Sequence, residues 1–327
     1  MVIVTPYLRA ANNGNWQTAW RWRRHLAGTC QARIVAAWPD EQADGDEVMI
    51  ALHARRSAPS IAAWAAAHPG CCLAVALTGT DLYRDIGNDA AARRSIELAQ
   101  VLVTLQELGP RVLPETLRDK ARVIYQSATS RRALAKPTLL LRAVMVGHLR
   151  DEKSPETLFA AARLLAERGD IRIDHIGAGL DPALAEAARA TMAAAPGYRW
   201  LGGLSHDATR RRIQRAHVLV HASRMEGGAH VIIEAVVSGT PVVAARIDGN
   251  VGMLGTDYAG YFPWGDAEAL AALLRRGRED AAFLSALTDQ CHARAPKFDP
   301  QTERFALELV VNDLMAQDFE GNGHLGR

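Results

Sequence analysis

The chain has 327 residues, of which 49% are hydrophobic and 23% charged, a composition typical of a globular protein rather than a disordered one. Its formal net charge of +2 argues against nucleic-acid binding through bulk charge. The apolar start has no charged segment before it and no apolar run is long enough to span a membrane, so we expect neither a signal peptide nor a membrane anchor. The four cysteines lack metal-binding spacing, and we expect a protein of the reduced cytoplasm.

The first part of the chain alternates short apolar runs with helical patterns. The expected strands cover residues 2–5, 33–37, 48–53, 73–77, 101–105 and 122–125. The expected helices include residues 16–26, 60–67 and 90–100. This alternation predicts an open parallel sheet with helices on both faces.

The pattern breaks at Lys136-Pro137, and a second alternating series follows. Its expected strands cover residues 139–146, 171–176, 198–201, 217–222 and 242–245, and its helices cover residues 155–167, 182–195, 207–215 and 230–237. We therefore predict an α/β protein with two doubly wound Rossmann-like domains, residues 1–137 and 138–300, facing a central cleft. Such sheets bind ligands at the carboxyl ends of their strands.

Polar residues fill the loop after the first strand. They are Asn12, Asn13, Gly14, Asn15 and Gln17. The amides and the start of the following helix would suit an anion, which makes the loop a candidate binding segment. The alternative is a capped surface loop.

The strand at residues 73–77 ends in the turn Thr78-Gly79-Thr80-Asp81. Asp81 could hold a ligand hydroxyl or act as a base, or it could simply cap a helix. Both interpretations stay open on the sequence alone.

The first strand of the second series leads into Gly147-His148-Leu149-Arg150 and then Lys153-Ser154-Pro155. Ser154 is a suitable helix N-cap, with Pro155 at the first helical position. Lys153 beside this helix start could neutralise a diphosphate leaving group, although a solvated lysine is the alternative.

Glu226 and Glu234 are eight positions apart in the most informative segment of the chain. A strand, a polar turn, two glycines and a helix that starts near His230 direct free N–H groups and a positive helix end toward a phosphate or diphosphate. Because carboxylates repel phosphate, the two glutamates should bind hydroxyl groups instead. A ligand with a central diphosphate and hydroxyls on both sides is a nucleotide sugar.

Three further patterns carry less information. The Gly177-Ala178-Gly179 sequence lacks the third glycine of a dinucleotide fingerprint, since Pro182 occupies that place. The pair Asp44 and Asp46 has the spacing of a metal-binding pair, but it lies in a run typical of a solvated turn. An arginine-rich run that includes Arg211 and Arg212 is typical of the solvated face of an amphipathic helix. We predict no metal and no cofactor.

The segment from Ser223 to Ala244 closely resembles the donor-binding signature of retaining GT-B glycosyltransferases. This resemblance implies a GT-B fold and metal-independent transfer from a nucleotide sugar. It also implies that a C-terminal helix, residues 301–316, packs back on the N-terminal domain ahead of a flexible tail at residues 317–327. The chain departs from the family at His148, where the family has a diphosphate-binding arginine, and at Thr78, where many relatives have a histidine that contacts the donor sugar.

A narrower resemblance extends over almost the whole chain. The strings NNGNWQTAWRW, LTGTDLYRDI and VGHLRDEKSPETLF look like those of the selenosugar synthases of selenoneine biosynthesis, an offshoot of the GT-B enzymes. Membership would imply that selenophosphate attacks the anomeric carbon of a UDP-sugar, with UDP-N-acetylglucosamine as the expected donor. UDP and phosphate would be released and a 1-selenosugar would remain.

The resemblance also assigns roles to residues. Glu234 would hold the ribose hydroxyls, Glu226 would contact the donor sugar, and Lys153 would assist the diphosphate. The rest of the donor site would comprise Gly14, His148, Gly227, Gly228, Ala229, His230 and Val231. The acceptor side would comprise Asn12, Asn13, Asn15, Gln17, Thr78, Asp81, Arg84 and Arg150.

Three other functions fit the same motifs. An ordinary GT-B glycosyltransferase would use a carbohydrate or lipid acceptor, and an epimerase would need no acceptor. A non-catalytic sugar-nucleotide-binding protein would bind the donor without turnover.

Overall fold

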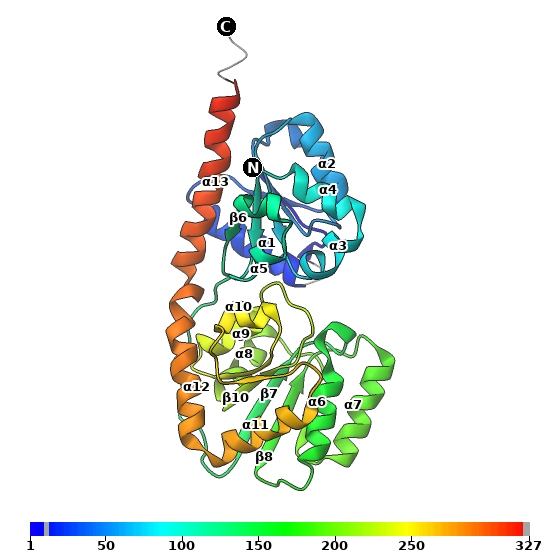
Figure 1. The fold of residues 1–327 in the computed structure, drawn as a ribbon, viewed down its shortest axis with the longest axis vertical. Coiled ribbons are helices and arrows are strands. Elements are labelled where there is room, and N and C mark those ends of the chain that lie inside the picture. Colours follow the sequence, from blue (N-terminus) through cyan, green and yellow to red (C-terminus); the bar gives the residue numbers. More distant parts are fainter. Residues whose placement is uncertain (10–12, 323–327) are drawn as a thin grey trace. The chain divides into compact units, whose positions relative to one another are not determined.

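The structure, a computed structural model, describes residues 1–9 and 13–322 (Figure 1). The chain divides into two compact units. The first comprises Met1–Ser127, Glu226–Gly228 and Pro300–Arg327, and the second comprises Ala128–Met225 and Ala229–Asp299. The sequence pattern predicted a first boundary after residue 137, whereas the units divide after Ser127 and the short segment Glu226–Gly228 groups with the first unit.

The first unit contains a six-stranded parallel sheet in the order β2-β1-β3-β4-β5-β6. The strands are β1 (Val2–Val4), β2 (Arg33–Val35), β3 (Met49–Leu52), β4 (Leu73–Leu77), β5 (Val101–Thr104) and β6 (Ala121–Val123). The helices are α1 (Gly14–Leu26), α2 (Ala58–Ala67), α3 (Ile86–Asn88), α4 (Ala90–Leu98), α5 (Gly109–Val112) and α13 (Pro300–Asn322). Every residue of β1, β3, β4 and β5 is buried, because helices cover both faces of a parallel sheet.

Helix α13 is part of the first unit although it comes last in the sequence. Its apolar residues Leu307, Val310 and Leu314 belong to the core formed by the first sheet. The buried Glu303 carboxylate accepts hydrogen bonds from Trp22 Nε1 (2.8 Å) and from Arg21 Nε (2.8 Å), both on α1. One apolar stripe and one buried ion pair therefore hold this helix in place.

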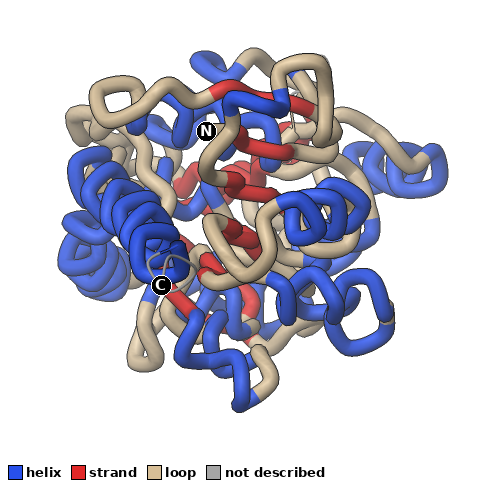
Figure 2. The backbone as a smooth tube through the Cα atoms, turned by 90° about the horizontal axis from the view of Figure 1, so that it is seen from above, coloured by secondary structure: helices blue, strands red, loops and turns tan. Residues whose placement is uncertain are grey.

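The second unit contains another six-stranded parallel sheet in the order β12-β11-β10-β7-β8-β9. The strands are β7 (Leu141–Val146), β8 (Ile171–Ile176), β9 (Tyr198–Trp200), β10 (Val218–His221), β11 (Val242–Ala245) and β12 (Tyr261–Phe262). The helices are α6 (Pro155–Leu164), α7 (Pro182–Ala194), α8 (His206–Arg215), α9 (His230–Val236), α10 (Asp248–Leu254), α11 (Ala267–Glu279) and α12 (Ala281–Arg294). Figure 2 shows the backbone of the chain with its strands in red and its helices in blue.

The predicted α/β class with two parallel sheets is confirmed. Most predicted elements are found with their ends moved by one or two residues. The C-terminal helix is longer than predicted, because it continues to Asn322 through part of the expected tail. The remaining tail residues, 323–327, lie outside the described residues.

Candidate functional site

The loop after β7 runs beside the loop after β8 in the second unit. The Gly147 N–H donates to the Ile176 carbonyl (2.9 Å), and the Leu149 N–H donates to the Ala178 carbonyl (2.9 Å). A Cβ on Gly177 would lie 1.9 Å from the Gly147 carbonyl oxygen, so no residue with a side chain fits there. This close packing explains why position 177 is glycine, and no dinucleotide-binding role is needed to account for it.

His148 is fixed by one backbone hydrogen bond in this loop. Its Nδ1 accepts the Ala178 N–H at 3.0 Å, so the neutral ring carries its proton on Nε2. Loss of solvation, and then the charges of Arg150 and Lys153, lower the pKa of His148. At neutral pH the side chain can therefore donate one hydrogen bond, but it lacks the charge of the family arginine.

Lys153 ends a short 3₁₀ turn, Asp151–Lys153, directly before α6. Its Cγ and Cδ lie 3.3 Å from the point where a Cβ on Gly147 would sit, so the lysine stem packs on the start of the loop. Helix α6 begins at Pro155 as predicted, but the predicted N-cap is wrong. Ser154 has a left-handed backbone (φ 45°) and makes no capping bond, because its hydroxyl instead accepts Trp264 Nε1–H at 3.0 Å.

Helix α9 begins at His230, next to the predicted diphosphate segment. Ala229 occupies the N-cap position in an extended conformation and makes no side-chain capping bond. The first N–H groups of α9 therefore donate no hydrogen bond to a side chain at the N-cap position, which usually accepts one. Ala229, His230 and Val231 are the residues predicted to bind a diphosphate here.

Glu234, on the second turn of α9, is a buried carboxylate surrounded by basic side chains. Its Oε1 lies 2.6 Å from His206 Nε2, 3.5 Å from His230 Nδ1 and 3.9 Å from Arg210 Nη1. Burial raises the pKa of Glu234, but the hydrogen bonds from His206 and His230 outweigh it and bring the pKa to about 2. The carboxylate is therefore ionised throughout the physiological range.

Sequence reasoning missed His206 as a partner of Glu234. Its side chain is 74% exposed, whereas that of Glu234 is 6% exposed, so the imidazole lies between the carboxylate and solvent. The hydrogen bond to Glu234 raises the pKa of His206. Only the polar start of α8, which follows Ser205, marks this region in the sequence.

Glu226, Gly227 and Gly228 group with the first unit. A Cβ on Gly227 would lie 2.5 Å from the Thr78 carbonyl carbon, and one on Gly228 would lie 2.7 Å from Leu105 Cβ. The close approach of these backbone segments therefore requires glycine at both positions, whether or not a ligand binds there. Glu226 is half-buried.

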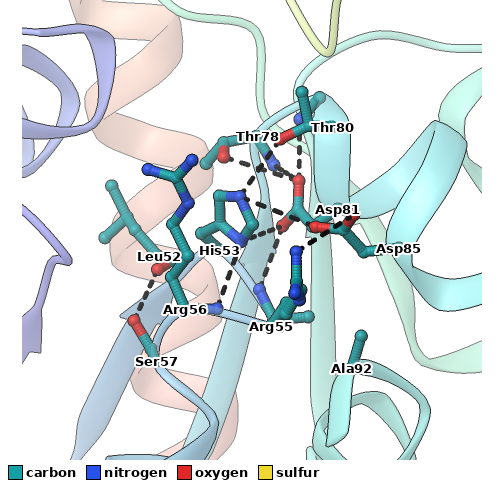
Figure 3. A network of polar contacts seen from close by, with 12 residues as sticks. Leu52, His53, Arg55, Arg56, Ser57, Thr78, Thr80, Asp81, Asp85 and Ala92 are labelled. Carbon is teal, nitrogen blue, oxygen red and sulfur yellow. Dashed lines mark hydrogen bonds and ion pairs between the residues drawn. The ribbon is translucent and has the colours of Figure 1, made fainter. Parts of the chain in front are cut away.

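The turn after β4 is organised by Asp81, which is fully buried (Figure 3). Its Oδ1 accepts the N–H groups of Thr78 and Gly79 at 2.9 Å, and its Oδ2 accepts the Ala54 N–H at 3.0 Å. With its oxygens occupied by backbone donors, this carboxylate holds the turn that presents Thr78.

His53 lies next to Asp81 at the end of β3 and was also missed. It is buried with a left-handed backbone (φ 74°), and its Nε2 lies 3.1 Å from Thr80 Oγ1. Asp85 Oδ2 is 4.0 Å from the same nitrogen and has no hydrogen-bond partner within the described part of the chain. Figure 3 shows the imidazole beside both carboxylates. A histidine at the end of a predicted strand was the one available signal.

Some of the residues predicted to form a binding loop after the first strand instead begin helix α1. Asn13 is its N-cap and accepts the Trp16 N–H at 3.1 Å, while Gly14 and Asn15 form its first turn. Gln17 is exposed on the same helix, and Asn12 lies outside the described residues. Of the two predicted acceptor-side arginines, Arg84 bonds Asp85 Oδ1 through Nε (3.0 Å), and Arg150 is exposed.

Residues 1–9 and 13–322 contain no group of three or more metal-ligating side chains placed to hold a metal ion. The Asp46 carboxylate, one of the spaced aspartates, instead accepts Arg33 Nε at 3.1 Å and Trp38 Nε1 at 3.2 Å. No helix among the described residues is both long and apolar enough to cross a membrane.

A family model described as glycosyl transferases group 1 matches residues 126–296, slightly more than half of the chain. Comparison with curated protein sequences gives no match. Sucrose-phosphate synthase from Thermosynechococcus elongatus is similar in structure, with a TM-score of 0.73 at 16% identity over 97% of this chain and 98% of that one. HepE from Anabaena, solved in complex with UDP, has a TM-score of 0.73 at 14% identity over 96% and 99% of the two chains.

TarM from S. aureus is similar over a smaller share of its own length. A mutant solved with Fondaparinux, alpha-GlcNAc-glycerol and UDP has a TM-score of 0.67 at 14% identity over 81% of this chain. The chain spans 55% of the TarM chain. At such identities these likenesses concern the fold, and they confirm the predicted two-domain GT-B architecture.

Proposed function

The chain belongs to the glycosyl transferases group 1 family, and we propose that it is a glycosyltransferase that uses a UDP-sugar. The observation that carries this proposal is the Glu234 carboxylate, buried and ionised on the second turn of a helix whose first N–H groups have no side-chain cap. An ionised carboxylate accepts two sugar hydroxyls well, and a helix start suits a diphosphate. The structures of HepE and TarM with UDP support a uridine nucleotide.

In this proposal each donor-side residue has a separate task. Glu234 accepts the ribose hydroxyls, while the N–H groups of Gly228, Ala229, His230 and Val231 hold the diphosphate. Lys153 neutralises the charge that develops on the leaving diphosphate, and neutral His148 donates one hydrogen bond to it. Glu226 and Gly227 contact the donor sugar, and Gly14 lies beside its phosphate.

We further propose that the acceptor is selenophosphate and the donor is UDP-N-acetylglucosamine. Selenium attacks the anomeric carbon while the bond to the UDP oxygen breaks, and water then splits the selenium–phosphorus bond to release phosphate. Such a nucleophile needs little deprotonation, which fits a site where Asp81 is occupied by backbone donors. Asn12, Asn13, Asn15, Gln17, Thr78, Arg84 and Arg150 would line the acceptor side.

The test is UDP release from UDP-N-acetylglucosamine by purified protein, with mass spectrometry of the product. Selenophosphate, thiophosphate and orthophosphate are compared as acceptors. The proposal predicts release that depends on selenophosphate and a sugar containing selenium. Turnover only with a carbohydrate acceptor would leave a glycosyltransferase and remove the selenosugar reaction.

A further inference from the structure

A hollow of about 420 Å³ lies in the second unit at the beginning of β7 and β8, beside the end of α8. Its charged lining consists of Arg142, Arg172, Asp174, Arg199, Arg212 and Arg215. Arg142 pairs in register with Arg172, and Asp174 pairs in register with Arg199, so strand neighbours present these groups side by side. This region is separate from Lys153, since five residues of extended chain from Arg142 to Gly147 span roughly 16 Å.

The hollow has a large excess of positive charge. Asp174 is its single carboxylate, and it accepts Arg199 Nη2 at 2.6 Å and Arg212 Nη1 at 3.0 Å. Arg172 donates to a neutral group, the Pro196 carbonyl, at 3.3 Å. Arg142 and Arg215 have no ion-pair partner among residues 1–9 and 13–316. One carboxylate thus faces five guanidinium groups, which stay charged at any physiological pH.

Ordinary surface chemistry does not explain this arrangement. A solvated sheet face usually mixes both signs, and like charges on neighbouring strands destabilise a sheet. Here Arg142 and Arg172 are direct neighbours, and two arginines of α8 add to the same excess. An anion in the hollow would relieve this repulsion and gain charge-assisted hydrogen bonds, in which the planar guanidinium matches phosphate oxygens.

We propose that this hollow is a binding site for a small, multiply charged phosphate compound, distinct from the donor site. The hollow is concave, and the excess of positive charge is confined to it, since the chain as a whole has a formal net charge of only +2. Both features favour a small molecule over a nucleic acid as the ligand. The shared chemistry of the ligand is a phosphate group next to a second negative charge. Both inorganic diphosphate and a phosphate ester have it.

The experiment titrates the full chain with sodium pyrophosphate, and separately with a sugar phosphate, by calorimetry at constant ionic strength. Each titration is repeated in saturating UDP, so that binding at the donor site is recognised by competition. The double variant Arg142→Gln/Arg215→Gln removes two of the three guanidiniums of the hollow that have no ion pair within residues 1–9 and 13–316. Arg93→Gln/Arg94→Gln, on exposed positions of α4, removes the same charge elsewhere.

The proposal predicts binding that persists in UDP, weakens at least about tenfold in the first double variant and is unchanged in the second. The stronger of the two probes identifies the ligand as an inorganic diphosphate or an ester. Equal affinity in both double variants would overturn the proposal, as would an effect that sodium chloride reproduces. Thermal unfolding of each variant checks that the fold is intact.

Discussion

Lys153 and Glu234 would interact with different parts of a UDP molecule, the diphosphate and the ribose, and their surroundings differ accordingly. Lys153 is half-buried at the end of a short turn, with its stem packed on Gly147. Glu234 is buried among His206, His230 and Arg210. In the proposed function, the first arrangement would place an ammonium group near the charge that develops on the leaving diphosphate, and the second would fix a permanent charge for donor binding.

Lys153→Ala should therefore lower kcat more than it raises KM. Removing one preorganised donor to a leaving group typically costs about 10²–10³ in rate. Lys153→Arg should keep a larger part of the rate, because the charge remains. Steady-state UDP release measures both parameters, and an unchanged kcat in Lys153→Ala would refute the leaving-group role.

The His206–Glu234 pair predicts a pH dependence of stability. The Glu234 pKa falls from 4.5 to about 2 on folding, while the His206 pKa rises above 6.5. The pair is fully stabilising above the ordinary glutamate pKa and below the ordinary histidine pKa. This stabilisation is lost as pH rises through the His206 pKa, and again as pH falls toward about 2.

His206→Ala should abolish the loss of stability that the original chain shows as pH rises through the His206 pKa. The difference in unfolding free energy between the variant and the original chain should stay below about 1 kcal/mol, because the imidazole is mostly exposed. It should be largest on the acidic side of pH 6.5 and disappear at alkaline pH. Urea unfolding across this range measures it, and a difference independent of pH would show that the pair does not titrate as described.

At the scale of elements, two contacts hold segments that the sequence leaves far apart. Gly177 lets the loops after β7 and β8 touch, and Glu303 fixes α13 against α1. Each contact can be tested by one substitution with a matched control.

Gly177→Ala should displace the loop that carries His148 and Lys153. A Cβ there would lie 1.9 Å from the Gly147 carbonyl oxygen, and backbone cannot move away cheaply. We expect a loss of about 1–3 kcal/mol in stability and weaker donor binding. Gly169→Ala is the control, because nothing lies within 4 Å of its added Cβ. Equal thermal midpoints for both variants would contradict this account of the loop.

Glu303→Gln should destabilise the first unit strongly. Burial raises the pKa of Glu303, but Arg21, His25 and Ser127 outweigh it and bring the pKa to about 2. The neutral amide would leave Arg21 without its ionic partner, at a cost of about 3–5 kcal/mol. Glu308→Gln, at a partly exposed position of the same helix whose carboxylate pairs with Arg304, should change the unfolding free energy much less. Similar losses in both variants would exclude a special role for Glu303.

The sequence predicted strands better than side-chain partners. Strands such as β4 and β5 are buried on both faces, so their apolar runs are visible without knowing the fold. Ser154 was misjudged because its hydroxyl bonds Trp264, 110 positions away. His53 and His206 were missed because their partners, Thr80 and Glu234, lie 27 and 28 positions away. No local spacing rule records such tertiary contacts.

At the scale of the molecule, the two units share one architecture, a six-stranded parallel sheet, but contain different polar and charged features. The second unit has the buried glutamate, the uncapped helix start and the arginine-lined hollow, and the family model lies almost wholly within it. The first unit has the buried His53–Asp81–Asp85 network. A formal net charge of +2 conceals this uneven distribution of charge.

The central claim is that Glu234 and its helix bind the uridine diphosphate of a donor. Calorimetric titration with UDP tests it most directly, on the original chain, on Glu234→Gln and on Glu268→Gln, an exposed glutamate of α11. We predict that UDP binds the original chain and Glu268→Gln equally, and that Glu234→Gln, folded by circular dichroism, binds at least about tenfold more weakly. Equal UDP binding by Glu234→Gln, or no binding by the original chain, would contradict the account.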